Sequence, residues 1–286
     1  MATILVTGAT GNIGSPTVEN LASRPGVTVR AAVHARPAGS LPDNVETVEV
    51  DIDEPETLVA AAIGVDAAFL ITPSVPNQVE LAERAVNALK SAGVPRLVRL
   101  SAIGADWQDA ALFMREHTET EKQIIASGIP YTFVRPNSYM SNFLTFYRPD
   151  PEGNIRLPLG QAGVSYIDPR DVAGVAAHVL TSEGHVGKGY TLTGPKAVTV
   201  DEIAAAISEA TGRSISYVDV PEEAMRQGML SQGLPPAVVD GVVDLFATNR
   251  AGKAAVVTDA VRDITGRPPR SFQEFARDHA EGWKEG

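Results

Sequence analysis

Short apolar runs alternate with longer segments of helical periodicity along the first half of the chain. Six of these runs predict strands, and most are apolar throughout, as expected for strands that are covered on both faces. They occupy residues 3–7, 27–34, 45–51, 67–71, 96–101 and 131–135. Between the fourth and fifth of these strands, residues 77–92 place apolar side chains on one helical stripe, and this predicted helix ends at Gly93. This alternation predicts βαβ units and a parallel sheet.

The pattern changes after Pro136. Prolines and glycines divide residues 149–160 into short pieces, which predict a loop or a small hairpin. Further strands are expected at 164–167, 190–193 and 214–219, and further helices at 169–181, at 201–211 and near Pro221, Pro236 and Ser271. The segments 164–167 and 190–193 are expected to rejoin the main sheet.

We therefore predict an α/β fold, namely a doubly wound Rossmann-type parallel sheet with a smaller, partly interleaved C-terminal α+β region that binds the substrate. Residues 1–150 form the Rossmann domain, which is completed by about 164–193. Residues 151–163 and 194–286 form the smaller region.

Composition narrows the classes of partner. The 286 residues with 44% hydrophobic content suffice for one large core and a smaller one. A net charge of -11 argues against nucleic acid as a partner, although a local pocket for one phosphate remains open. The absence of cysteine removes disulfides and thiolate metal sites, and no His, Asp or Glu cluster has metal-ligand spacing. No apolar run reaches about 18 residues, so we expect no membrane span and a cytoplasmic protein.

A glycine-rich loop follows the first predicted strand and precedes a helix-compatible segment. It reads Gly8-Ala9-Thr10-Gly11-Asn12-Ile13-Gly14. Gly8 permits a tight turn, Gly11 lets backbone amides approach a pyrophosphate, and Gly14 allows close packing of the helix. The helix N-terminus then faces negative charge. We expect Gly8, Thr10, Gly11, Asn12, Ile13 and Gly14 to bind a dinucleotide; the alternative is a ligand-free turn.

The wide spacing of these glycines resembles the atypical short-chain dehydrogenase/reductases, and in particular their NmrA-like branch. Similar segments extend along nearly the whole chain: Val50-Asp51, Ser127-Gly128-Ile129-Pro130-Tyr131, Ile167-Asp168-Pro169-Arg170-Asp171, Tyr190-Thr191-Leu192-Thr193-Gly194 and Thr265-Gly266-Arg267-Pro268. The resemblance implies a nicotinamide cofactor. It also implies either a reductase or a redox sensor, because the family contains both.

The end of the second predicted strand bears on the choice of nicotinamide cofactor. An acidic residue about 20 positions after the glycine loop usually binds the ribose of NAD, whereas arginine accommodates the 2′-phosphate of NADP. Here the chain reads His34-Ala35-Arg36, without an acid between residues 27 and 42. We therefore expect His34 and Arg36 to favour NADP(H), with NAD(H) still possible. Asp51 and Ile52 are expected to flank the adenine.

The Tyr-x-x-x-Lys pair of most short-chain dehydrogenases is missing before the sixth strand. His117 and Glu121 stand there instead, on one helical face, and the resemblance to quinone and dye reductases makes them the catalytic candidates. We expect His117 to orient an acceptor carbonyl or donate a proton, and Glu121 to hold its ring nitrogen and raise its pKa. The alternative is an exposed pair that only supports the helix. Ser101, at the end of the fifth strand, is a further candidate.

Other candidates follow the fourth and sixth strands. Asn137 resembles a family position near the nicotinamide, and Tyr139 and Phe143 offer aromatic faces to a planar acceptor. Thr72 and Pro73 are expected to border the nicotinamide ribose. Asp168 is expected to cap a helix that begins with Pro169.

Two main functions remain open from the sequence, and a third, an isomerase, lyase or epimerase that uses the bound cofactor without net redox change, would normally need the missing tyrosine. The first is an NAD(P)H-dependent oxidoreductase that transfers hydride to a small, planar, conjugated electrophile such as a quinone, dye, enone or imine. The second is a non-catalytic NAD(P)-binding redox sensor of the NmrA type. A sensor is expected to have the space above the nicotinamide filled, and a reductase to have it open. The sequence does not indicate whether the protein is a monomer or a homodimer.

Overall fold

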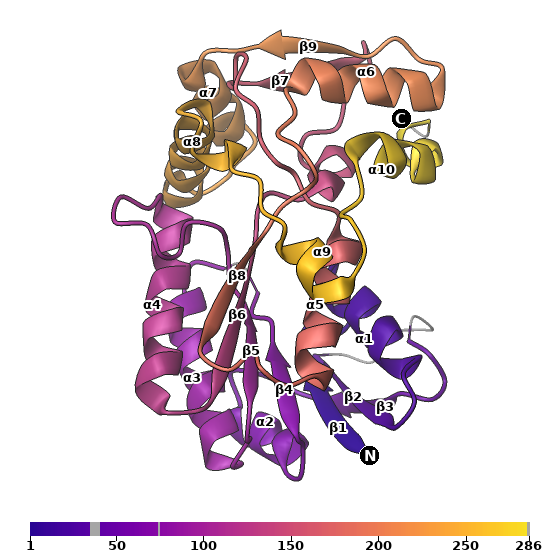
Figure 1. The fold of residues 1–286 in the computed structure, drawn as a ribbon. Coiled ribbons are helices and arrows are strands. Elements are labelled where there is room, and N and C mark those ends of the chain that lie inside the picture. The colour runs from indigo at the N-terminus through magenta and orange to yellow at the C-terminus, as the bar shows by residue number, and fades with distance from the viewer. Residues whose placement is uncertain (35–40, 74, 285–286) are drawn as a thin grey trace.

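A seven-stranded parallel sheet lies at the centre of the chain, of which the computed structural model describes residues 1–34, 41–73 and 75–284 (Figure 1). The strand order is β3-β2-β1-β4-β5-β6-β8. The strands are β1 (Ala2–Val6), β2 (Val27–Val33), β3 (Glu46–Glu49), β4 (Ala67–Leu70), β5 (Leu97–Leu100), β6 (Tyr131–Pro136) and β8 (Lys188–Leu192). The six strands predicted for the first half are confirmed, and the strand expected at 190–193 adds to the edge beside β6.

Helices cover both faces of this sheet. On one face lie α1 (Gly14–Ala22), α5 (Pro169–Thr181) and α9 (Ala260–Thr265), and on the other lie α2 (Pro55–Ala62), α3 (Gln78–Ser91) and α4 (Leu112–Ser127) (Figure 1). Alternate residues of β1 enter different cores, since Ile4 packs with α1 and α5 whereas Leu5 packs with α2 and α3. Within the described residues, no helix combines the length and apolarity needed to cross a membrane.

The strand order reverses between β1 and β4. The chain first runs outward through β2 and β3, and then crosses to the other side of β1. In open α/β sheets such a reversal opens a crevice at the carboxyl ends of the strands, which is where ligands bind. The glycine loop leaves β1 at this point.

A second, smaller sheet pairs β7 (Asn154–Leu157) with β9 (Ser216–Asp219) in parallel. It packs with α6 (Val200–Thr211), α7 (Glu222–Ser231), α8 (Pro236–Arg250) and α10 (Phe272–Asp278) at the other end of the molecule (Figure 1). The helix α8 also contacts α4, and Asp244 accepts a hydrogen bond from the Leu112 amide at 2.8 Å. This contact brings the second region against the crevice of the main sheet.

Two expectations for the middle of the chain are wrong. Residues 154–157 form β7, which pairs with a strand about sixty residues later, and not with its neighbour in a hairpin. Residues 164–167 make only isolated bridges, to Val198 and Tyr139, because both of their ends turn toward different elements. The helix start at Asp168 is confirmed, since its carboxylate accepts from the Arg170 amide at 2.8 Å and Pro169 occupies the first turn.

Candidate active site

Two positions of the glycine loop, Gly8 and Gly14, accept only glycine. Gly8 adopts a φ of +58°, which favours a residue without a Cβ. An ideal Cβ on Gly14 would lie 2.0 Å from the carbonyl oxygen of Gly8, far inside van der Waals contact. The Gly11 amide donates to that same carbonyl at 3.0 Å and closes the turn. The expected roles of Gly8 and Gly14 are thus confirmed in their geometry.

The N-terminus of α1 fits an anionic group. Ile13, the residue before the helix, supplies no side-chain cap, so the first amides of α1 lack a side-chain partner from that position. Thr10 is exposed in the same loop. The side-chain amide of Asn12 donates a hydrogen bond to the Ser141 hydroxyl at 2.8 Å. A tight loop in which Gly8 and Gly14 leave no room for a side chain, next to a helix N-terminus, matches the requirements of a dinucleotide pyrophosphate.

A cavity of about 360 Å³ extends from the glycine loop to the start of α4 and to α8. Its lining includes Gly8, Gly11, Asn12, Ile13, Gly14, Thr72, Gln78, Arg99, Ser101, Phe113, His117, Asn137, Tyr139, Asn142 and Leu245. Most of the residues expected at the site are therefore brought together. Phe113 of α4 faces α8 closely enough that a Cβ on Gly241 would lie 2.6 Å from its ring, so α8 closes one side of the cavity.

Glu121 does not hold His117, contrary to expectation. Its carboxylate is engaged by Arg135 of β6, through Nε at 2.9 Å and Nη2 at 2.6 Å, and by the Ser101 hydroxyl at 2.6 Å. Arg135 competes successfully because its planar guanidinium matches the carboxylate with two parallel hydrogen bonds. Glu121 is 5% exposed. Its hydrogen bonds join α4 to the end of β5 and to β6. Ser101 and Glu121 form a structural network at the wall of the cavity.

His117 lines the cavity as a neutral ring. Its Nδ1 is buried without a hydrogen-bond partner. Burial, and secondly the positive charge of Arg99, lower the pKa of His117 to about 3. The expectation that Glu121 raises this pKa is therefore wrong, because Glu121 is paired elsewhere and a cation is near instead. At neutral pH His117 can orient a ligand by hydrogen bonding, but it does not act as an imidazolium acid.

Arg99 is a cavity residue that the sequence reasoning missed. It lies in β5, is 2% exposed, and donates from Nη1 to the Leu70 carbonyl at 3.1 Å and from Nη2 to the Thr72 hydroxyl at 2.8 Å. Its Nε is buried without a partner. Burial lowers the pKa of Arg99 to about 10, so the guanidinium remains charged at neutral pH. The available signal was a lone arginine in an otherwise apolar strand.

The residues after β6 divide between the cavity and the second core. Tyr139 lines the cavity, and burial raises its pKa. Asn137 also borders the cavity, but its amide donates to Ser165 at 2.8 Å and to the Ala254 carbonyl at 2.9 Å. Phe143 is wrong as a substrate residue: it is fully buried among the aromatic rings of the second core, because the short helical turn at Met140–Leu144 directs it away from the cavity.

At the expected adenosine end, His34 is exposed, and its Nδ1 lies 3.8 Å from Asp51. Ile52 is half-buried beside the same strand end. Arg36 lies outside the described residues. Thr72 borders the cavity, whereas Pro73 is exposed and does not belong to the lining.

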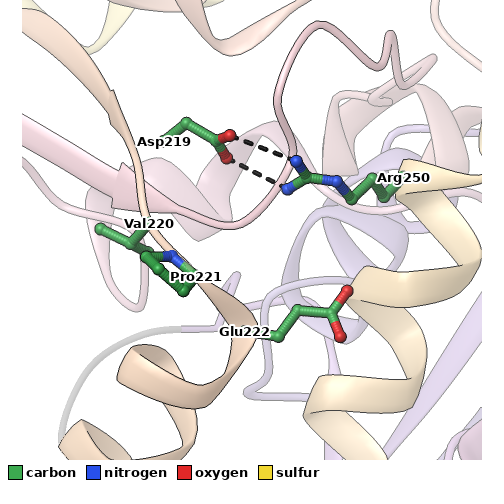
Figure 2. A pocket seen from close by; sticks show the side chains of 5 residues that line it. All are labelled: Asp219, Val220, Pro221, Glu222 and Arg250. Atoms are coloured by element: carbon green, nitrogen blue, oxygen red, sulfur yellow. Dashed lines mark hydrogen bonds and ion pairs between the residues drawn. The ribbon is translucent and has the colours of Figure 1, made fainter.

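A second cavity, of about 400 Å³, lies between β9, α7 and α8. Figure 2 shows its lining, Asp219, Val220, Pro221, Glu222 and Arg250, with the carboxylate of Asp219 facing the guanidinium of Arg250. These two groups form an ion pair at 3.2 Å, and Asp219 also accepts from the Gly160 amide. The opposite charges of Asp219 and Arg250 in the second cavity are thus paired with each other. The second cavity shares no lining residue with the first.

Comparisons with known proteins agree with this geometry. A model of the NmrA-like family matches residues 1–254. The chain is 41% identical to an NAD(P)H azoreductase of Xenophilus azovorans, over 97% of this chain and 98% of that protein. It is 36% identical to a (4-alkanoyl-5-oxo-2,5-dihydrofuran-3-yl)methyl phosphate reductase of Streptomyces griseus, over 98% and 99%. The structure of an Escherichia coli NADPH-dependent quinone oxidoreductase with NADPH superposes with a TM-score of 0.86 at 27% identity, over 96% and 99%.

Proposed function

The chain belongs to the NmrA-like family, and on that premise we propose that it is an NAD(P)H-dependent reductase of small, planar, conjugated electrophiles such as quinones and dyes. One observation carries the proposal: a single open cavity of about 360 Å³ joins the glycine loop to His117 and Tyr139. A sensor would need the part of this cavity at the glycine loop for its dinucleotide, but it has no need of the part that reaches Phe113 and His117. The names of the azoreductase and quinone oxidoreductase relatives support the same reaction class.

The residues fit a dinucleotide. Gly8, Gly11 and Gly14 would hold the pyrophosphate at the N-terminus of α1, and Thr72 would border the nicotinamide ribose. We propose NADPH as the preferred form, because residues 27–42, which include His34 and Arg36, contain no acid to bind an unphosphorylated ribose. When bound, the cofactor supplies the hydride.

The protein's own contribution is positioning and electrostatics. Phe113 and Leu245 exclude water from the side of the cavity near α8. His117, neutral at pH 7, offers a hydrogen bond that orients the acceptor. The hydride brings two electrons and one proton to the acceptor. Water supplies the second proton, which completes the reduction. A quinone needs no more than this, because it is already electrophilic.

The test is NADPH oxidation followed at 340 nm with a panel of quinones and azo dyes. His117→Ala should lower kcat by about tenfold or more and leave NADPH affinity unchanged, because the ring is proposed to contact the acceptor. His178→Ala is the matched control, since His178 is also half-buried but lies in α5 outside the cavity. NADPH binding without turnover on any acceptor would contradict the reductase and favour the sensor.

Cofactor preference needs its own measurement. We expect kcat/KM to be higher with NADPH than with NADH, and Arg36→Ala to reduce that ratio by about tenfold through loss of a charge-assisted contact with the 2′-phosphate. Lys196→Ala, which removes an exposed cation from the second region, serves as the control. An unchanged ratio in Arg36→Ala would contradict this assignment.

A further inference from the structure

Arg99 carries a buried positive charge that forms no ion pair within the described residues, although the nearby Glu121 carboxylate stabilises it electrostatically. Its two contacts are a neutral carbonyl, Leu70, and a neutral hydroxyl, Thr72. No ion pair of Arg99 occurs among the described residues, and its Nε has no partner at all. A buried charge whose hydrogen-bond partners are all neutral is costly, because its lost hydration is only partly compensated. Such a charge is typical of a site where a ligand supplies the opposite sign.

The other charged groups near the cavity are already committed. Arg135 forms ion pairs with both Glu121 and Asp106. Glu116 accepts a hydrogen bond from Gln78. Tyr139 stays protonated because burial raises its pKa, and His117 stays neutral because burial lowers its own. The guanidinium of Arg99 is therefore the one buried charge in the cavity lining without an ion-pair partner in the described chain.

We propose that Arg99 is a specificity-determining residue that selects planar acceptors bearing an anionic substituent, such as a sulfonate or a carboxylate. This inference rests on the proposed reductase function and names the class of its substrate. The guanidinium and the neutral His117 ring lie in the same cavity, so they offer donors to an acidic group while Tyr139 offers a planar face. Cationic acceptors of the same shape are disfavoured, because they place like charges together in a low-dielectric site.

A charge series of one acceptor tests this directly. We would compare 1,4-naphthoquinone-2-sulfonate, 2-methyl-1,4-naphthoquinone and a naphthoquinone with a quaternary ammonium substituent, with NADPH as the reductant. In the wild type, kcat/KM should be at least about tenfold higher for the sulfonate than for the neutral quinone, a ratio worth about 1.4 kcal/mol. It should be lowest for the cation.

Variants of Arg99 then separate charge from shape. Arg99→Gln keeps hydrogen-bonding capacity and should bring the sulfonate-to-neutral ratio close to one, whereas Arg99→Lys should keep most of the preference. Arg84→Gln, which removes an exposed cation from α3, should leave the ratio unchanged. Binding of the sulfonated quinone to the NADP⁺ complex, in which no hydride can be transferred, should weaken by the same factor in Arg99→Gln when it is measured by calorimetry. The circular dichroism spectrum and the NADPH affinity of Arg99→Gln should match those of the wild type, which shows that the variant retains the folded cavity.

The outcomes distinguish this inference from the reductase proposal. If none of the acceptors supports NADPH oxidation by the wild type, the reductase proposal fails. Calorimetry with the charge series still decides whether Arg99 selects anions. A loss in Arg99→Gln that is equal for all three quinones overturns the inference and makes Arg99 a positioning residue for β4 and β5. A weakened affinity for NADPH alone, with an unchanged ratio among acceptors, overturns it in favour of a cofactor contact.

Discussion

The bidentate pair between Glu121 and Arg135 should be a principal stabilising element of the cavity wall. Glu121→Gln removes the charge from a carboxylate that is 5% exposed and accepts three hydrogen bonds. Removing one partner of a buried pair typically costs 3–5 kcal/mol. Arg135 retains Asp106, so we expect the lower end, about 3 kcal/mol. For a protein of this size that loss corresponds to a fall in Tm of roughly 5 °C.

Urea unfolding followed by circular dichroism measures the loss, with Glu119→Gln as the control on the same helix. Glu119 is 55% exposed and pairs with Lys122 one turn away, so its replacement should change stability by less than about 0.5 kcal/mol. The His117 resonance should stay that of a neutral ring in both variants, because Glu121 is not its partner. Equal stability losses in the two variants, or a wild-type His117 that titrates near pH 7, would refute the assigned network.

Two further substitutions test the loop and the buried histidine. Gly14→Ala places a Cβ 2.0 Å from the Gly8 carbonyl and should abolish NADPH binding by titration, whereas Gly174→Ala in α5, where the nearest atom is 4.0 Å away, should retain it; binding by both variants would show that the loop tolerates a side chain. His117 is protonated below about pH 6.5 in the unfolded chain but only near pH 3 when folded, so it destabilises the fold as pH falls. The wild type should lose about 2 kcal/mol more than His117→Gln between pH 7 and 5, and parallel pH profiles would contradict a buried neutral ring.

The main sheet could be predicted from sequence because its strands are local, apolar and separated by periodic helices. The glycine loop was also readable, since the requirement for Gly8 and Gly14 is a backbone property of a strand-loop-helix unit. The small sheet was predicted only in part, because the strand expected at 214–219 is β9 but β7 and its pairing with β9 were missed. Each of its strands has four residues, and they pair in parallel across about sixty intervening residues, so neither turn chemistry nor periodicity at 154–157 marks the partner.

The side-chain partners of the site were the weakest part of the prediction. Helical spacing correctly placed His117 and Glu121 on one face of α4, but it does not reveal which strand residue meets that face. Arg135 of β6 does so, and it takes the carboxylate. Phe143 shows the same limit, because one short helical turn moves it from the cavity to the second core. Both errors arise from tertiary contacts that a single segment of sequence does not encode.

Taken with the missing Tyr-x-x-x-Lys, the protonation states at the cavity restrict the chemistry. With pKa values of about 10 for Arg99 and about 3 for His117, each stays in one form between pH 5 and 8. Tyr139 likewise remains a phenol, because burial raises its pKa. These three residues therefore supply fixed charge and orientation but no titrating acid. An acceptor that requires protonation during hydride transfer, such as an unactivated ketone, should not be reduced, whereas acceptors that hold the added charge by conjugation should be.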